Sequence, residues 1–198
     1  MKKSFFKNKG FTLIELIIAV SIFVFMTAYL LTKYGTFSQG ILLTNLAYDV
    51  ALTIRNAQSY GLNVRGIDIG ESQGTEYKYP YGVHFSSESS YNKLFTLFAD
   101  TSVSDGIYQN DTNISITNIK RGSYISKICF SSSSCASGSP FLKNRADITF
   151  KRPFPNAIIK YTGDASTAYP YVEITLTSTD GSTKRVTVRS TGQITIKD

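Results

Sequence analysis

The stretch Lys9-Gly10-Phe11-Thr12-Leu13-Ile14-Glu15 opens an apolar run that continues to Leu31. Within this run four residues interrupt the hydrocarbon: Thr12, Glu15, Ser21 and Thr27. At the helical rise of about 1.5 Å per residue, a run of this length can cross a bilayer. The sequence therefore predicts a transmembrane helix over residues 11–32, with one carboxylate near its start.

An acid inside lipid needs a positive partner, and Glu15 has none nearby in its own segment. A charged side chain within a bilayer costs roughly 2.5 kcal/mol or more, so such an acid is a candidate functional residue. Cleavage after Gly10 would create a new α-amino group on Phe11, one helical turn before Glu15. That amino group would supply the missing positive charge.

The positive charge of the chain is concentrated before the apolar run. The 198 residues carry a formal net charge of +7, and the first ten contain four lysines and no acid, which leaves +3 for the rest. Lysines on this side of an apolar segment favour a cytoplasmic N-terminus and an extracytoplasmic head. The high isoelectric point is therefore weak support for nucleic-acid binding, and the run is too long for an ordinary secretory signal.

The predicted helix continues beyond the membrane, because no proline precedes Pro80. A one-sided apolar stripe follows the i, i+3, i+4 spacing of a helix and comprises Leu43, Leu46, Ala47, Val50, Ile54 and Ala57. Gly61 is a suitable C-terminal stop. We expect an amphipathic extension over residues 33–61, followed by an irregular connection up to Tyr79.

Strand signals dominate the remainder of the chain. Short runs rich in β-branched and aromatic residues occur at 81–85, 94–99, 113–119, 125–130, 147–150, 157–161, 171–177, 184–189 and 193–196. The clearest pattern places Val172, Ile174 and Leu176 on one strand face, with Val186 and Val188 on the next strand after the turn Asp180-Gly181. This pattern predicts an antiparallel hairpin with one buried face.

These elements indicate an α+β fold in which a long N-terminal helix packs on an antiparallel β-sheet head. The amphipathic stripe is the one long apolar helix face that can cover such a sheet. We divide the chain into a leader (1–10), a transmembrane helix (11–32), an amphipathic extension of the same helix (33–61) and a β-rich globular head (62–198).

The two cysteines, Cys129 and Cys135, enclose a short serine-rich loop. If the head lies outside the cytoplasm, an oxidising compartment favours a disulfide between them. Two free thiols in a reducing compartment are the alternative.

The segment Lys9-Gly10-Phe11-Thr12-Leu13-Ile14-Glu15-Leu16-Ile17 resembles the class III leader junction of type IV prepilins and type II secretion pseudopilins. The close resemblance covers about the first thirty residues. A looser resemblance to H-type minor pseudopilins extends over residues 46–61, Phe98-Ala99-Asp100, residues 150–153 and Gly192-Gln193-Ile194. The chain departs from many major pilins in having Thr32 where they have a proline.

The resemblance implies that a prepilin peptidase and methyltransferase cleaves after Gly10 and N-methylates Phe11. It further implies a pilin-like fold and assembly into a homo- or hetero-oligomeric filament, a type IV pilus or a secretion pseudopilus, by a membrane platform with a separate ATPase. Glu15 would pair with the Phe11 amine of a neighbouring subunit, and membrane lipid would surround the apolar helix before assembly. Pairing of the two within one chain, with the acid placed at the helix N-terminus, is the alternative.

Asp100 and Asp105 are weak calcium candidates, in a segment that ends at Gly106. The spacing does not fit an EF-hand, and two acids make a poor cage. A hairpin turn at Asp105-Gly106 is the simpler interpretation, and nothing in the sequence brings Asp111 close.

Other candidate groups favour structural roles. His84 has no Cys or acid at motif spacing, so a structural or exposed histidine is expected. The serines 131–134 lack the strand-to-helix setting of a nucleophile elbow. Lys151, Arg152 and Lys160 would form a basic patch for DNA or a neighbouring subunit, whereas a chain reversal at a sheet edge is the simpler interpretation.

The sequence therefore favours a structural filament subunit rather than an enzyme, without a cofactor. A membrane-anchored binding head for DNA, glycan or secreted protein, which does not polymerise, is the second hypothesis.

Overall fold

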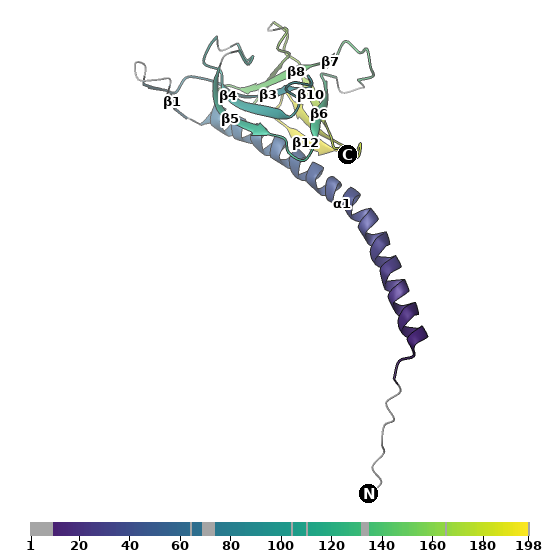
Figure 1. The fold of residues 1–198 in the computed structure, drawn as a ribbon. Coiled ribbons are helices and arrows are strands. Elements are labelled where there is room, and N and C mark those ends of the chain that lie inside the picture. Colours follow the sequence, from purple (N-terminus) through teal and green to yellow (C-terminus); the bar gives the residue numbers. More distant parts are fainter. Residues whose placement is uncertain are drawn as a thin grey trace. The chain divides into compact units, whose positions relative to one another are not determined.

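The computed structural model describes residues 10–197 except 64, 69–73, 104, 110, 132–134 and 165, and it leaves the side chains of 33–37 undescribed. The leader lysines and three of the four loop serines lie outside these residues. The chain divides into two compact units, Met1–Ser38 and Gln39–Asp198. One helix, α1 (Leu13–Leu62), runs through both, and the twelve strands seen in the described residues belong to the second unit (Figure 1).

Within the first unit, the Leu13–Thr32 part of α1 is predominantly apolar. Residues Leu13–Thr32 have a mean hydropathy of 2.4, and none of them is buried. A helix of this length and composition is able to cross a membrane.

Two five-stranded antiparallel sheets and one two-stranded ribbon make up the β structure. The first sheet has the order β5-β4-β3-β8-β9, with β3 (Tyr81–Ser86), β4 (Leu94–Ala99), β5 (Thr112–Asn118), β8 (Arg145–Phe150) and β9 (Ala157–Lys160). The second has the order β12-β11-β10-β6-β7, with β6 (Tyr124–Cys129), β7 (Leu142–Lys143), β10 (Tyr171–Thr177), β11 (Thr183–Arg189) and β12 (Ile194–Lys197). The ribbon pairs β1 (Ile67–Asp68) with β2 (Thr75–Glu76).

The α+β class and the antiparallel head are confirmed. In the predicted hairpin, Val172 lies opposite Val188 and Ile174 opposite Val186. Two predictions were wrong in detail: the strands form two sheets rather than one, and residues 62–79 contain the ribbon β1-β2. Alternation along a strand predicts its buried face, but it carries no information about which strands become neighbours.

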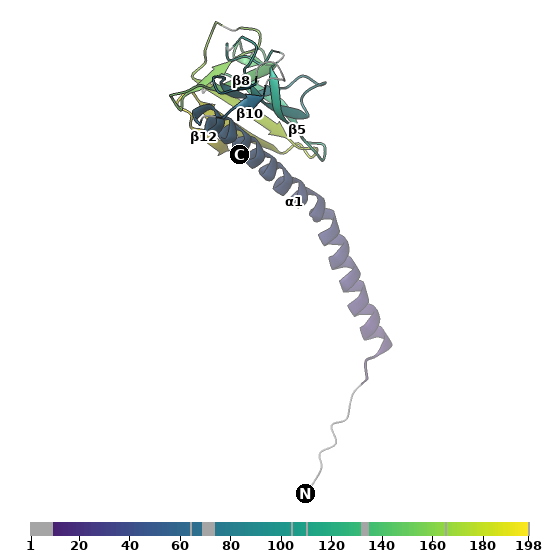
Figure 2. The same cartoon turned by 90° about the vertical axis from the view of Figure 1, so that its left-hand side faces the viewer.

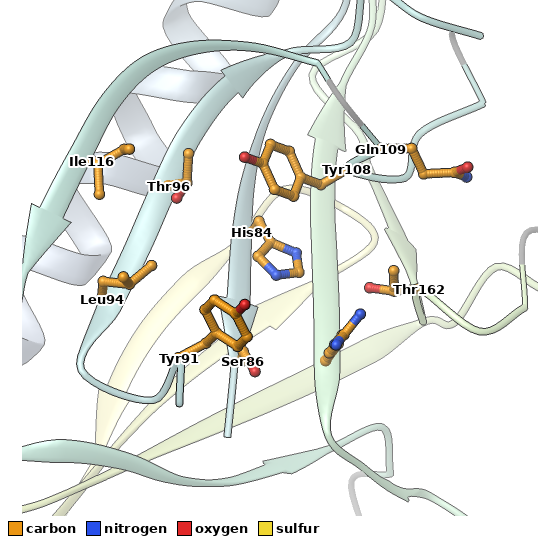
Figure 3. A pocket seen from close by; sticks show the side chains of 10 residues that line it. His84, Ser86, Tyr91, Leu94, Thr96, Tyr108, Gln109, Ile116 and Thr162 are labelled. Carbon is orange, nitrogen blue, oxygen red and sulfur yellow. The ribbon is translucent and has the colours of Figure 1, made fainter. Parts of the chain in front are cut away.

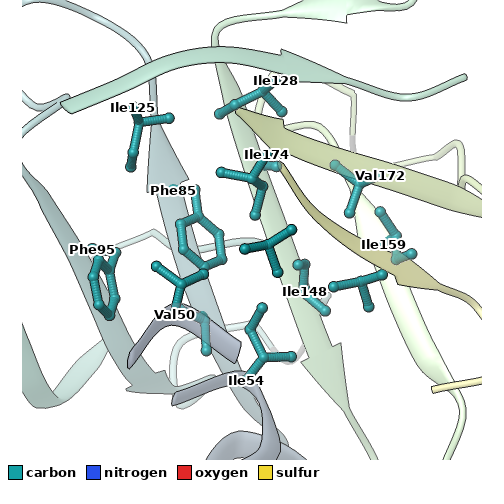
Figure 4. Close-up of a cluster of buried hydrophobic side chains, with 14 of the residues drawn as sticks. Val50, Ile54, Phe85, Phe95, Ile125, Ile128, Ile148, Ile159, Val172 and Ile174 are labelled. Atoms are coloured by element: carbon teal, nitrogen blue, oxygen red, sulfur yellow. The ribbon is translucent and has the colours of Figure 1, made fainter. Parts of the chain in front are cut away.

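One hydrophobic core joins both sheets to the second half of α1 (Figure 4). The predicted stripe is buried at Leu43, Ala47, Val50, Ile54 and Ala57, and Leu46 is half-buried against the same core. Figure 2 shows this half of the helix lying across the strands of the second unit. The helix stripe therefore covers apolar sheet faces that would otherwise meet water.

Gly61 is not the C-terminal stop, because α1 continues to Leu62. A Cβ built on Gly61 would lie 2.5 Å from the carbonyl oxygen of Phe150, the last residue of β8. The glycine therefore permits the helix backbone to approach the strand closely.

Candidate functional site

The start of α1 is closed by a reciprocal contact between Thr12 and Glu15. Oε2 of Glu15 accepts from the backbone N and from Oγ1 of Thr12, each at 3.4 Å, and the backbone N of Glu15 donates to Oγ1 of Thr12 at 3.3 Å. This is the capping box of the S/T-x-x-E pattern, in which an N-cap hydroxyl and an acid three residues later satisfy free backbone amides. The contact fixes Glu15 at the positive end of the helix dipole.

Three hydroxyl groups of the apolar segment, those of Ser21, Thr27 and Thr32, are satisfied inside the helix. Each donates to a carbonyl three or four residues earlier: Ser21 to Ile17 at 2.7 Å, Thr27 to Phe23 at 2.8 Å and Thr32 to Tyr29 at 2.7 Å. A polar side chain bonded in this way can enter lipid at little cost. The charge of Glu15 is therefore the feature of residues 11–32 that is least compatible with lipid.

The apolar side chains of this segment form an exposed surface on all sides of the helix. Their exposed fractions range from 52% at Ile17 to 81% at Phe11. Such a surface is stable in contact with lipid or with other apolar helices, but not with water.

Gly10 lies three residues before the first residue of α1, Leu13, and is exposed. No described atom lies within 4 Å of a Cβ built on it. The fold of this chain therefore does not require glycine at this position, and any such requirement must come from a molecule that acts on the segment.

The Cys129–Cys135 disulfide is present, with the two Cα atoms 5.9 Å apart. Cys129 is the last residue of β6, and Cys135 lies in the loop before β7. The ammonium group of Lys127 also donates to the carbonyl oxygen of Cys135. The disulfide therefore fixes the loop to the end of β6.

The calcium candidates bind backbone amides of their own loop. Oδ2 of Asp100 accepts from Gly106 N at 2.8 Å, and Oδ1 of Asp105 accepts from Ile107 N at 2.9 Å. Asp111, which the sequence did not place, folds back so that its Oδ1 accepts from the backbone N of Thr101 and of Ser102, each at 2.9 Å.

This acidic loop is therefore ordered by backbone hydrogen bonds. No group of three or more Asp, Glu, His or Cys side chains able to hold a metal ion occurs among the residues described. The simpler interpretation, a plain hairpin turn at Asp105-Gly106, is confirmed only in part: β4 and β5 pair as neighbours, but their connection runs from residue 100 to residue 111.

The predicted basic patch is divided between two settings. Arg152 donates to the carbonyl oxygen of Tyr77, and Lys160 donates to the carbonyl oxygen of Asp105 at 2.6 Å. Cations that bond backbone carbonyls of their own domain are partly committed to the fold. This placement gives no support to a DNA interface.

His84 has a partner that sequence spacing did not reveal. Its Nδ1 lies 2.6 Å from Oδ1 of Asp147, a carboxylate that is completely buried. The two residues are 63 positions apart and meet because β3 pairs with β8, where His84 lies opposite Asp147. The alternation of β8 could have placed Asp147 on the face opposite Ile148, but the strand pairing was needed to find the contact.

Residues 5–31 match the family described as the prokaryotic N-terminal methylation motif. No curated protein and no solved structure matches the chain. The matched residues include Gly10, Phe11, the capping pair and nearly all of the exposed apolar surface. The N-terminal segment therefore matches the class III leader motif of type IV pilins and pseudopilins, and an apolar helix that fits this motif follows it.

Proposed function

We propose that this chain is a structural subunit of a type IV pilus-like or type II secretion filament. In this proposal it is cleaved after Gly10, N-methylated at Phe11 and polymerised through its apolar helix. It acts by assembly and performs no chemistry of its own. The match of residues 5–31 to the methylation motif is the observation that carries the proposal.

The electrostatics of the helix start support a role for Glu15 in assembly. The contacts of Glu15 with Thr12 involve neutral donors at 3.4 Å, at the long end of hydrogen bonding, so they orient the carboxylate without neutralising it. An unpaired charge in lipid costs roughly 2.5 kcal/mol or more. A cation brought close to Glu15 would therefore lower the free energy of the inserted helix.

Cleavage after Gly10 would produce such a cation. The new amine of Phe11 would stay positively charged after methylation, and it would be one residue from the capping threonine. In a bundle of staggered helices, this amine would pair with Glu15 of a neighbouring subunit, and both groups would then be compensated. The exposed apolar side chains from Phe11 to Leu31 would exchange lipid for other helices during the same step.

In the membrane before assembly, the proposal places the N-terminus in the cytoplasm and the head outside it. The divisions proposed from the sequence fit this path, since residues 11–32 would lie in lipid and residues 62–198 would form the head. A prepilin peptidase and a membrane assembly platform would act on the chain in turn. The product would be a filament at the cell surface or in a periplasm-like space.

Mass spectrometry of the membrane-extracted chain tests the processing step. We expect the mature N-terminus to be Phe11 with one added methyl group. An intact leader, Met1 to Gly10, on all of the extracted protein would overturn the proposal. An unmethylated terminus at Phe11 would support the proposed cleavage but contradict the proposed methylation.

A further inference from the structure

The first sheet has a hollow of about 460 Å³ on its outer face (Figure 3). In β3, Val83 and Phe85 enter the core, so His84 points to the opposite side of the sheet. Thr96 of β4 and Arg145 of β8 line the same hollow. Its floor is therefore built on paired strands within one compact unit.

The imidazole in this floor is held in a fixed orientation. A carboxylate can only accept, so Nδ1 of His84 donates to Oδ1 of Asp147. Oδ2 of Asp147 accepts from the hydroxyl of Thr162 at 2.7 Å. The chain of contacts leaves Nε2 of His84 as the ring nitrogen that can bond a molecule in the hollow.

Arg145, whose guanidinium also lines the hollow, is paired as well. Nε of Arg145 donates to Oε1 of Glu88 at 3.1 Å, and Nη2 donates to Oε2 at 2.8 Å. This bidentate contact lowers the pKa of Glu88 below its ordinary value, so the acid stays ionised beside the guanidinium. Within this pair the guanidinium and the carboxylate compensate each other, so neither is free to bind an anion or a cation.

The walls are aromatic and apolar. The Tyr108 ring packs on His84 with centroids 4.8 Å apart, and the Tyr91 side chain is 54% exposed. Figure 3 shows the imidazole between the rings of Tyr91 and Tyr108. Ile116, which is 52% exposed, extends the apolar part of the lining along β5.

We propose that this hollow binds an uncharged carbohydrate of one or two sugar rings. A sugar presents C–H faces that pack on tyrosine rings and hydroxyl groups that both donate and accept. The polar groups of the lining, Thr96, Gln109 and Nε2 of His84, match those hydroxyl groups. The volume lies within the range of small-ligand sites. This binding activity goes beyond the filament role and does not depend on it.

The test uses the full chain, solubilised in a detergent that has no sugar head group. The probe is a printed array of neutral di- to tetrasaccharides, with sialylated and sulfated oligosaccharides of the same cores. We expect retention of at least one neutral oligosaccharide and weaker retention of its charged form. The affinity for the retained sugar is then measured by titration.

Two substitutions of exposed tyrosines, one in the hollow and one outside it, show whether the sugar binds in the hollow or elsewhere on the surface. Tyr91→Ala should weaken binding about ten-fold or more, because it removes an aromatic wall. Tyr48→Ala removes a 62% exposed tyrosine of α1 outside the hollow and should leave the affinity unchanged. Circular dichroism verifies that both variants fold.

Retention of no neutral oligosaccharide would overturn the proposal. Equal affinity in wild type and Tyr91→Ala would also overturn it, since binding would then occur elsewhere. Preference for the charged forms would contradict the argument from paired charges. Binding of an uncharged tripeptide, Gly-Tyr-Gly, without any sugar would assign the hollow to a peptide segment instead.

Discussion

The carboxylate of Glu15 turns back toward Thr12, so that its Oε2 lies 3.4 Å from both the backbone N and Oγ1 of that residue. The pair forms a capping box at the start of α1. This contact explains how the carboxylate is held in the unprocessed chain. It does not explain why the residue is an acid, because a glutamine satisfies the same box without a charge.

Replacement of Gly10 should separate processing from folding. In the proposed function Gly10→Val blocks cleavage, while the open space around Gly10 means that the fold is unaffected. Mass spectrometry should therefore find the leader intact, and thermal unfolding of the head should match wild type. Normal cleavage of Gly10→Val would show that cleavage does not require a small residue at position 10.

A methyl group at Gly61 should destabilise the head. Its Cβ would lie 2.5 Å from the carbonyl oxygen of Phe150, so α1 and β8 would have to separate. Overpacking of this kind costs about 1–3 kcal/mol, and denaturant unfolding followed by circular dichroism measures it. Gly40→Ala is the matched control, because no described atom outside the neighbouring helix backbone lies within 4 Å of a Cβ built on it, and alanine favours a helix by about 0.5–1 kcal/mol. Equal effects at the two glycines would contradict the packing argument.

Loss of the disulfide should weaken the head without unfolding it. The Cys129–Cys135 bridge has a sequence separation of 6, and a loop this short gives about 2 kcal/mol in the chain-entropy account. The double substitution Cys129→Ser with Cys135→Ser should lower the free energy of unfolding by that amount or less. Non-reducing peptide mapping of the wild type checks the starting state, and free thiols at both positions would contradict it.

Asp164 should contribute a pH-dependent part of head stability. Hydrogen bonds lower the pKa of Asp164 from 3.8 to about 2; the largest cause is the bond from the Ser166 hydroxyl, and the next is the bond from Thr167. Because the pKa of Asp164 is lower in the folded state than in the unfolded state, its carboxylate stabilises the fold at pH values above the unfolded-state pKa. This contribution is lost as the pH falls through about 2.

The variant Asp164→Asn should therefore be less stable than wild type at pH 6, with the difference shrinking between pH 4 and pH 2. Urea midpoints measured across this range provide the test. Ser166→Ala removes the largest cause of the pKa shift. This variant should therefore lose the stabilisation from Asp164 at a higher pH than wild type does. A difference between wild type and Asp164→Asn that is independent of pH would argue against the assigned cause.

Local patterns were sufficient to predict much of the head. Alternating valines and isoleucines placed Val172 and Val188 on the buried face of a hairpin around Asp180-Gly181, and the two residues lie opposite each other in the structure. The apolar stripe from Leu43 to Ala57 was also predicted correctly, since helical spacing identifies the helix face that packs against a sheet.

Contacts between distant segments were not predictable in this way. His84 meets Asp147 only through the pairing of β3 with β8, and Asp111 returns to Thr101 only through the path of its loop. The division into two sheets depends on the same long-range choices. The hollow beside His84 was therefore invisible in the sequence, although each of its residues belongs to a predicted strand or to a connection between strands.

The central claim is that the charge of Glu15 is needed for assembly. Glu15→Gln keeps the capping box and the length of the side chain but removes the charge, whereas Thr12→Val removes the cap and keeps the charge. The measurement is the amount of each processed variant in sheared filaments, relative to its amount in the membrane.

We predict that Glu15→Gln is cleaved and inserted normally but is depleted from filaments more than about ten-fold, because the neighbouring Phe11 amine stays unpaired. Thr12→Val should enter filaments near the wild-type level. Recovery of Glu15→Gln in filaments at the wild-type level would contradict the account and reduce Glu15 to a helix cap.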